Sequence, residues 1–180
     1  MPDCSREQVR PCCGSPRRIV TSATELLERA HQGLRLHICG EHDAARSLLQ
    51  SLWNELGTDG NPLVRCCTAH YLADLQTSAE SSLQWNLSAR QEADRIVDID
   101  AVDAELGVCG RQLYPSLLLN LCEDYRKLGQ WQQACEVLRQ ARLAVAQVDS
   151  PAHTAGVVAA LDAIADRLST DAASRAAGGA

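Results

Sequence analysis

Cysteine and histidine residues at two places in the chain have a spacing that could bind a metal ion. Cys66 and His70 are four residues apart and would share one face of a helix, and residues 37–42 (HICGEH) bring three thiol or imidazole groups to an expected turn. Neither place has the paired short spacing of a strong zinc site. The cysteine before Gly40 can equally end a helix, and His70 can hydrogen-bond to Asp74. We therefore expect no metal and no cofactor.

The other cysteines point to reduced thiols. The chain has nine cysteines, an odd number, and no secretion signal, which disfavours a disulfide framework. Arginines near the first three cysteines would favour the reactive thiolate, although an inert flexible arm over residues 1–20 explains the same segment; these residues are Cys4, Cys12, Cys13, Arg10, Arg17 and Arg18. Cys67, Cys122 and Cys135 fall in apolar helical patterns, so we expect them in the core.

Enzymatic signatures are missing from the chain. It has no phosphate-binding loop, dinucleotide fingerprint, zinc-protease motif or nucleophile elbow. Four acidic residues could suggest acid–base chemistry or a cation site, but they lack the glycine and the final glutamate of a calcium loop; they are Asp98, Asp100, Asp103 and Glu105. We expect a non-enzymatic protein, and a catalytic site assembled from His31, His37 and His70 is the least favoured alternative.

Composition narrows the fold and the class of partner. The chain has 180 residues, 17 basic against 23 acidic side chains and a formal net charge of −6, which disfavours nucleic acid as a partner. Its hydrophobic fraction of 46% is mostly Leu and Ala with only 3% aromatic residues, so an all-α domain is expected. Residues 1–20 have no apolar run typical of a signal peptide, and no apolar stretch could span a membrane. A cytoplasmic location follows.

Hydrophobic spacing predicts seven helices. The expected ranges are about 22–39, 45–56, 62–76, 78–97, 115–128, 131–144 and 151–168, with a possible short helix at 100–106 inside a long acidic connection. Capping-box patterns at Ser22/Glu25 and Thr77/Glu80 mark two helix starts. This divides the chain into a flexible N-terminal arm (1–20), a helical domain (21–168) and a disordered tail (169–180).

Residues 115–148 carry a helix-hairpin repeat pattern. Large and small residues alternate at the spacing of a tetratricopeptide unit: Leu118, Leu121, Cys122, Tyr125, Gly129, Ala134, Leu138 and Ala141. A looser copy occupies residues 26–56: Gly33, Leu36, Gly40, Ala45, Leu49 and Leu52. The hairpin expected between these two units, over residues 62–97, has no turn glycine. We therefore expect a tetratricopeptide-like stack of about three antiparallel helix hairpins, with the C-terminal helix as a cap.

Three short segments add a family resemblance. Residues 70–74 (HYLAD), 114–117 (YPSL) and 120–125 (NLCEDY) resemble those of small tetratricopeptide-like proteins of high-GC Gram-positive bacteria. The resemblance covers about residues 22–168 and implies a cytoplasmic protein-binding role. It brings no established active site.

In such a stack the first helix of each hairpin lines the inner surface, so its exposed residues are the candidate partner-binding positions. These are His31, Leu34 and His37, then Arg65, Ala69 and Ala73, then Ser116, Asn120, Glu123 and Lys127. Asn120 matches one position of the clamp with which some tetratricopeptide domains bind a peptide carboxylate. We expect an adaptor that binds a peptide or helix of another protein. The alternative is a regulatory sensor that binds a small molecule or metal, or responds to oxidants through its cysteines.

Overall fold

A computed structural model describes residues 22–96, 113–148 and 151–178 of the chain. These ranges form seven helices and contain no strand: α1 (Ala23–Ile38), α2 (His42–Leu56), α3 (Pro62–Asp74), α4 (Ala79–Asp94), α5 (Tyr114–Lys127), α6 (Trp131–Val145) and α7 (Pro151–Gly178). The prediction of an all-α fold is confirmed. The expected N-terminal arm, most of the acidic connection and its short helix lie outside the described residues.

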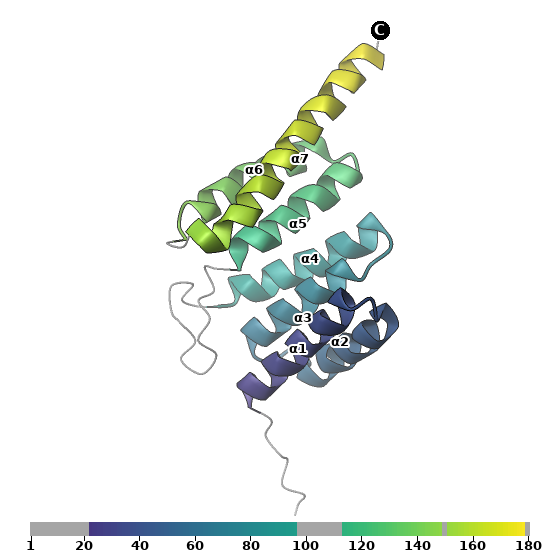
Figure 1. The fold of residues 1–180 in the computed structure, drawn as a ribbon, viewed down its shortest axis with the longest axis vertical. Coiled ribbons are helices and arrows are strands. Elements are labelled where there is room, and N and C mark those ends of the chain that lie inside the picture. Colours follow the sequence, from purple (N-terminus) through teal and green to yellow (C-terminus); the bar gives the residue numbers. More distant parts are fainter. Residues whose placement is uncertain (1–21, 97–112, 149–150, 179–180) are drawn as a thin grey trace, which may run out of the picture.

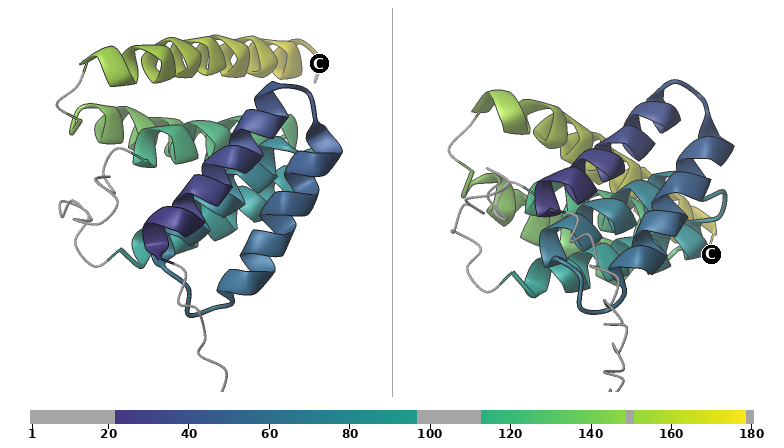
Figure 2. Two further views of the ribbon diagram at one scale, coloured as in Figure 1. Left: turned by 60° about the horizontal axis from the view of Figure 1, so that its bottom comes forward. Right: turned by 90° about the horizontal axis from the view of Figure 1, so that it is seen from below.

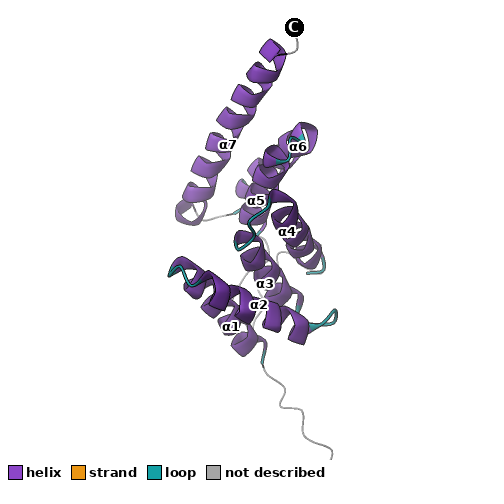
Figure 3. Cartoon of the chain, turned by 90° about the vertical axis from the view of Figure 1, so that its right-hand side faces the viewer, coloured by secondary structure: helices purple, strands orange, loops and turns teal. Residues whose placement is uncertain are grey.

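The helices pack as three consecutive pairs followed by a single helix. α1 packs on α2, α3 on α4 and α5 on α6, while α7 lies against both α5 and α6 (Figures 1 and 2). α1 and α7 lie toward the same side of the stack, with α3 and α5 between them (Figure 3). Between the first and second pairs, α3 contacts both α1 and α2; between the second and third pairs, α5 contacts mainly α4.

The first and third hairpins turn in the same way. Gly40 and Gly129 have φ values of +84° and +68°, the left-handed conformation that glycine adopts without a steric penalty. Each glycine N–H bonds to the carbonyl three residues back, at 2.9 and 3.0 Å. The next residue in each case bonds to the carbonyl five residues back, at 2.9 Å. This is the usual glycine-terminated helix end, which satisfies the last helical carbonyls.

Small residues let the helices of these two hairpins approach closely. A Cβ atom on Gly33 of α1 would lie only 2.5 Å from Leu49 Cγ of α2, so this position requires glycine. At the aligned position of the third hairpin, the Cys122 thiol donates to the Ala134 carbonyl at 3.3 Å. Ala45 and Ala134 are both fully buried. The repeat spacing read from the sequence therefore places its small residues at helix contacts.

The middle hairpin has a longer turn without glycine. Residues 75–78 connect α3 to α4, and Ser78 Oγ caps α4 by accepting from the Ser81 N–H at 3.2 Å. The capping box predicted at Thr77 and Glu80 is therefore wrong by one residue, because the adjacent serine takes the cap position. The capping box at Ser22 and Glu25 is confirmed by hydrogen bonds in both directions, at 3.2 and 2.9 Å.

α7 is longer than predicted. It continues to Gly178, so the prediction of a disordered tail is wrong for residues 169–178. Its end is attached to the third hairpin: Arg126 Nη1 lies 3.0 Å from Asp171 Oδ2, and the Arg175 guanidinium lies 3.9 Å from the centre of the Trp131 ring. Alanine has the highest helix propensity, so these two contacts extend a segment that already favours helix.

Candidate binding site on the inner face

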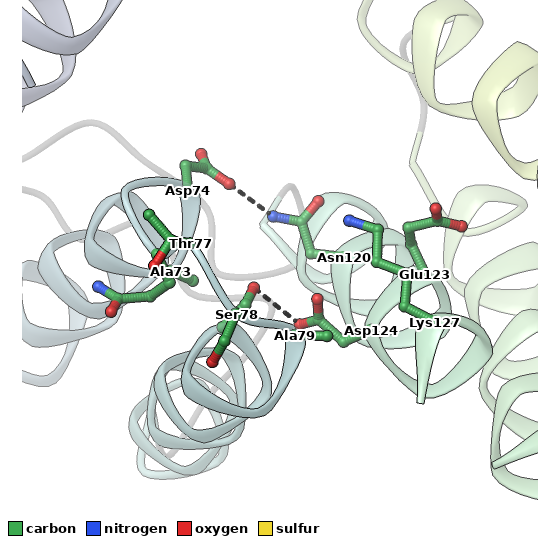
Figure 4. Close-up of a pocket in the computed structure, with 11 residues that line it drawn as sticks. Ala73, Asp74, Thr77, Ser78, Ala79, Asn120, Glu123, Asp124 and Lys127 are labelled. Atoms are coloured by element: carbon green, nitrogen blue, oxygen red, sulfur yellow. Dashed lines mark hydrogen bonds between the residues drawn. The ribbon is translucent and has the colours of Figure 1, made fainter. Parts of the chain in front are cut away.

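A polar pocket of about 410 Å³ lies where α5 faces the end of α3 and the α3–α4 turn (Figure 4). We call it the α3–α5 pocket. On one side it is lined by Ala73, Asp74, Gln76, Thr77, Ser78, Ala79 and Ser82, and on the other by Asn120, Glu123, Asp124 and Lys127. The pocket exists because α5 packs mainly on α4 and leaves the C-terminal end of α3 uncovered.

A hydrogen bond bridges the two sides of the pocket. Asn120 Nδ2 of α5 donates to Asp74 Oδ1 of α3 at 3.0 Å. A hydrogen bond to Asp74 or to a neighbouring backbone group was the alternative to a metal role for His70. His70 Nδ1 is buried and has no hydrogen-bond partner among the described residues. Asn120, predicted as a groove residue, thus lies at the centre of the pocket, whereas the role of Asp74 in the pocket was missed.

Asp124 forms the polar floor of the pocket. Only 3% of this residue is exposed, yet its Oδ2 accepts hydrogen bonds from Ser82 Oγ at 3.0 Å and from Asn86 Nδ2 at 2.8 Å. Its other carboxylate oxygen points into the pocket (Figure 4). Burial raises the pKa of Asp124 above its ordinary value, and the two hydrogen bonds oppose that rise only in part.

Sequence reasoning missed Asp124, although a signal was present. Asp124 lies on the same face of α5 as Leu117, Leu121 and Leu128, because these positions are three or four residues apart. A carboxylate on such an apolar face must be buried with hydrogen-bonding partners or remain unsatisfied. Asn86 occupies the same kind of position on α4, three residues after the buried Leu83.

A second recess of about 330 Å³, the α5–α7 groove, continues from the pocket along the other side of α5. It is lined by Leu119, Asn120, Glu123, Ala160, Ala163, Ile164 and Arg167. Asn120 and Glu123 line both recesses. The two recesses are therefore adjacent and share one wall, which is the exposed face of α5.

Glu123 is already neutralised by two arginines. Its carboxylate lies 2.9 Å from Arg126 Nε and 3.3 Å from Arg167 Nη2. Burial alone would raise the pKa of Glu123, but the hydrogen bonds and charge of Arg126, together with Arg167, outweigh burial and lower the pKa. In contrast, Lys127 is exposed and has no ion-pair partner in the ranges that the structure describes.

Three of the predicted groove residues therefore come together: Asn120, Glu123 and Lys127 all line the pocket. Ser116 does not line it, and its hydroxyl donates to the Leu113 carbonyl at 2.9 Å. Ala73 lines the pocket but is itself buried, and Ala69 is fully buried, so the prediction that both are exposed is wrong.

Arg65 is also wrongly predicted as a groove residue. Its side chain is only 7% exposed; Nε lies 2.8 Å from Glu92 Oε1, and its guanidinium lies 3.9 Å from the centre of the Trp53 ring. Nη1 also bonds to the Gly57 carbonyl. Arg65 thus joins α2, α3 and α4 in the interior. Arg65 was predicted to be exposed because it is charged. It is buried because α1, α2 and α4 all pack against α3.

The predicted residues of α1 lie away from the pocket. His31 and Leu34 are half-buried, and the His31 ring centre is 6.2 Å from that of Tyr71. His37 pairs with His42 at the α1–α2 turn, where the two Nδ1 atoms are 3.1 Å apart. None of the three lines the α3–α5 pocket or the α5–α7 groove.

The described residues contain no group of three or more His, Cys, Asp or Glu side chains placed to hold a metal ion. Burial raises the pKa of the Cys66 thiol, and it raises the pKa of Cys67 to about 12 and that of Cys122 to about 11, which disfavours their thiolates. Cys135 is exposed, so its predicted core position is wrong. The N-terminal cysteines and the acidic run 98–105 lie outside the described residues.

Within the described ranges, no helix combines the length and apolar character that crossing a bilayer requires. Comparison with protein-family models, curated proteins and solved structures finds no match for this chain. The function must therefore be inferred from the residues of the chain itself.

Proposed function

We propose that the chain is a tetratricopeptide-like adaptor that binds a segment of another protein across the inner face of α5. The repeat reading is supported by the shared turn at Gly40 and Gly129 and by small residues at corresponding helix contacts. α3 contacts α1 more extensively than it contacts α5, and the pocket lies beside this weaker contact.

The observation that carries the binding proposal is the pair of adjacent recesses on α5. Asn120 and Glu123 form a shared wall, so a segment that crosses this wall contacts both recesses. Small-molecule sites are mostly apolar and enclosed. The α3–α5 pocket is instead lined by carboxylates, an amide, hydroxyls and an ammonium group, which suits the polar side chains of a protein segment.

Site-specific photo-crosslinking in the native cell tests this proposal. A photoreactive amino acid at position 120 should crosslink to a defined partner, whereas the same group at Gln91, an exposed position on α4, should not. A synthetic peptide covering the crosslinked partner segment should then bind the purified full-length chain. Asn120→Ala should weaken that peptide by about fivefold to tenfold, as expected for loss of one interfacial hydrogen bond, while Gln91→Ala should not.

The crosslinks also provide the contradicting result. If position 91 captures the partner and position 120 does not, the binding surface includes the exposed side of α4 and not the α3–α5 pocket. If neither position captures a protein while the chain is folded and expressed, the adaptor function is wrong.

A further inference from the structure

We infer that the α3–α5 pocket binds a primary ammonium group, the side chain of a lysine in the partner segment, at Asp124 Oδ1, with Asp74 as a second carboxylate in the lining. This inference rests on the proposed function for the source of the lysine, but the pocket's chemistry can be tested without any partner protein. It identifies which group of the partner enters the pocket.

The first observation is the half-satisfied carboxylate of Asp124. Oδ2 accepts two hydrogen bonds, from Ser82 and Asn86, whereas Oδ1 has no donor in the part of the chain that the structure describes and faces the pocket (Figure 4). No described Lys or Arg forms an ion pair with this residue. Lys127 acts on Asp124 only through its charge, without a direct ion pair. A carboxylate that is 97% buried is costly unless a donor or a paired positive charge reaches it.

The second observation is an orphaned amide in the same network. Asn86 is 1% exposed, its Nδ2 is used by Asp124, and its Oδ1 has no hydrogen-bond partner in the described ranges. The Asn86 amide is thus oriented to donate to Asp124, and this orientation leaves its own carbonyl oxygen without a donor. This orientation holds the Asp124 carboxylate in place and keeps Oδ1 directed toward the pocket.

The distribution of charge around the pocket favours a cation. Of the three carboxylates in its lining, Glu123 is paired with two arginines, whereas Asp74 accepts a hydrogen bond from the neutral amide of Asn120. Asp124 accepts hydrogen bonds from neutral donors only, and Lys127 acts on it through its charge. Lys127 is the single basic residue in the lining. A ligand carboxylate would meet more negative than positive groups here, so the peptide-carboxylate clamp suggested by Asn120 is disfavoured.

The free acceptors also distinguish ammonium from guanidinium. An arginine side chain binds a carboxylate best through two parallel bonds to both oxygens, but Asp124 Oδ2 is already occupied. A lysine ammonium has three donors that point in different directions. It can therefore donate to the single free oxygen of Asp124, while Asp74 adds a second negative charge to the lining of the pocket.

The test is an NMR titration of the full-length chain with n-butylammonium chloride, at constant ionic strength. Saturable shifts are expected for the amides of Ser78, Asn120 and Asp124. n-Butyltrimethylammonium, which has the same charge but no donor, should bind about tenfold more weakly, as should n-butylammonium to Asp124→Asn, because each change removes a charge-assisted hydrogen bond. Asp43→Asn, at an exposed acidic position of α2, is the matched control and should leave the affinity unchanged.

Lys127→Ala gives a result of opposite sign for the two kinds of ligand. It should tighten n-butylammonium binding, since a competing positive charge is removed, and should weaken any binding of acetate. Asp74→Asn provides a second variant in case Asp124→Asn does not fold, and it should weaken n-butylammonium. The inference is overturned if shifts are not saturable, if both Asp variants bind like the wild type, or if acetate binds more tightly than n-butylammonium.

The failure of this inference is distinguishable from failure of the proposed function. If position 120 crosslinks to a partner but the pocket does not bind ammonium, the adaptor function is supported and the lysine-binding inference is wrong. If the pocket binds ammonium but no protein is crosslinked, the adaptor function is wrong and the pocket is a cation-binding site.

Discussion

The outer hairpins and the middle hairpin are held together by different means. α1–α2 and α5–α6 close through small residues and a glycine turn with the same hydrogen bonds, 89 residues apart. α3–α4 also buries small residues such as Ala69 and Ala89, but it adds a buried ion pair, Arg65 with Glu92, and turns through residues 75–78 without glycine. The pocket lies beside this irregular hairpin. The candidate site thus lies beside the hairpin whose turn lacks glycine and whose interior holds an ion pair.

The largest expected effect concerns the ion pair of the middle hairpin. Glu92→Ala leaves the Arg65 charge buried and should lower the free energy of unfolding by about 3–5 kcal/mol. Arg29 and Glu55 join α1 to α2 at the same 2.8 Å distance, but their side chains are 32% and 46% exposed. Glu55→Ala should therefore cost at most about 1 kcal/mol. Urea denaturation measures both variants, and equal costs would remove the distinction between the hairpins.

A double variant sharpens that result. Replacing Arg65 by Met and Glu92 by Leu should recover most of the stability lost in Glu92→Ala, because apolar residues of similar size avoid the cost of desolvating two charges. If the double variant is as unstable as the single variant, the loss reflects packing of the Glu92 side chain rather than the unpaired arginine.

Overpacking should affect the two outer hairpins equally. Ala45→Leu and Ala134→Leu each insert a larger side chain at a fully buried helix contact, and each should lower the free energy of unfolding by about 1–3 kcal/mol. Ala44→Leu, at an exposed position of α2, should change it by less than about 0.5 kcal/mol. Thermal and urea unfolding provide the measurement. A large cost at only one of the buried alanines would show that the two hairpins are not equivalent.

The turn glycines should show a smaller, matched effect. Gly40→Ala and Gly129→Ala place a Cβ in the left-handed conformation, and each should cost about 1–2 kcal/mol. Gly156→Ala is the control: a Cβ there has no atom within 4 Å, and the residue is helical, so this change should stabilise by up to about 1 kcal/mol. The same sign for all three substitutions would contradict the assigned turn geometry.

The smallest expected effect is on pH dependence at the middle-to-third junction. Because burial raises the pKa of Asp124, the native state holds this proton more tightly than the unfolded chain. The contribution of Asp124 to stability is therefore present below its unfolded pKa and lost as pH rises through its native pKa. As pH is raised from 4 to 7, the free energy of unfolding of the wild type should therefore fall relative to that of Asp124→Asn. A constant difference would mean that Asp124 titrates normally.

Local spacing was sufficient to predict the helices and the outer hairpins. Turn glycines and buried small residues leave a periodic signal within about 30 residues of chain, because both helices of a hairpin use it. The first and third hairpins were aligned on this basis, and their turns proved equivalent. An exposed neighbour of such a position was harder to predict: Cys135 is one residue, about 100° of helix rotation, away from the buried Ala134.

The candidate site depends on contacts between hairpins, which local spacing does not report. Arg65 was placed at the surface, yet nine of the thirteen residues of α3 are buried, so no face of this helix is left for a long polar side chain. Apart from Arg65 and Thr68, the run 63–69 (LVRCCTA) is apolar on all sides of the helix, which is the pattern of an interior helix. Asp124 likewise becomes meaningful only when α4 supplies Ser82 and Asn86.

The position of α7 has a consequence for the order of folding during synthesis. Leu161, Ile164 and Leu168 complete the same apolar cluster as Leu118, Leu121 and Ala134. A ribosome that has released the third hairpin, but not residue 168, therefore presents that cluster open to solvent and to other nascent chains. Because Arg126 and Trp131 then meet Asp171 and Arg175, the last helix closes the cluster only when nearly all of it has emerged. In the time between these two events the apolar cluster is open to contact with other chains.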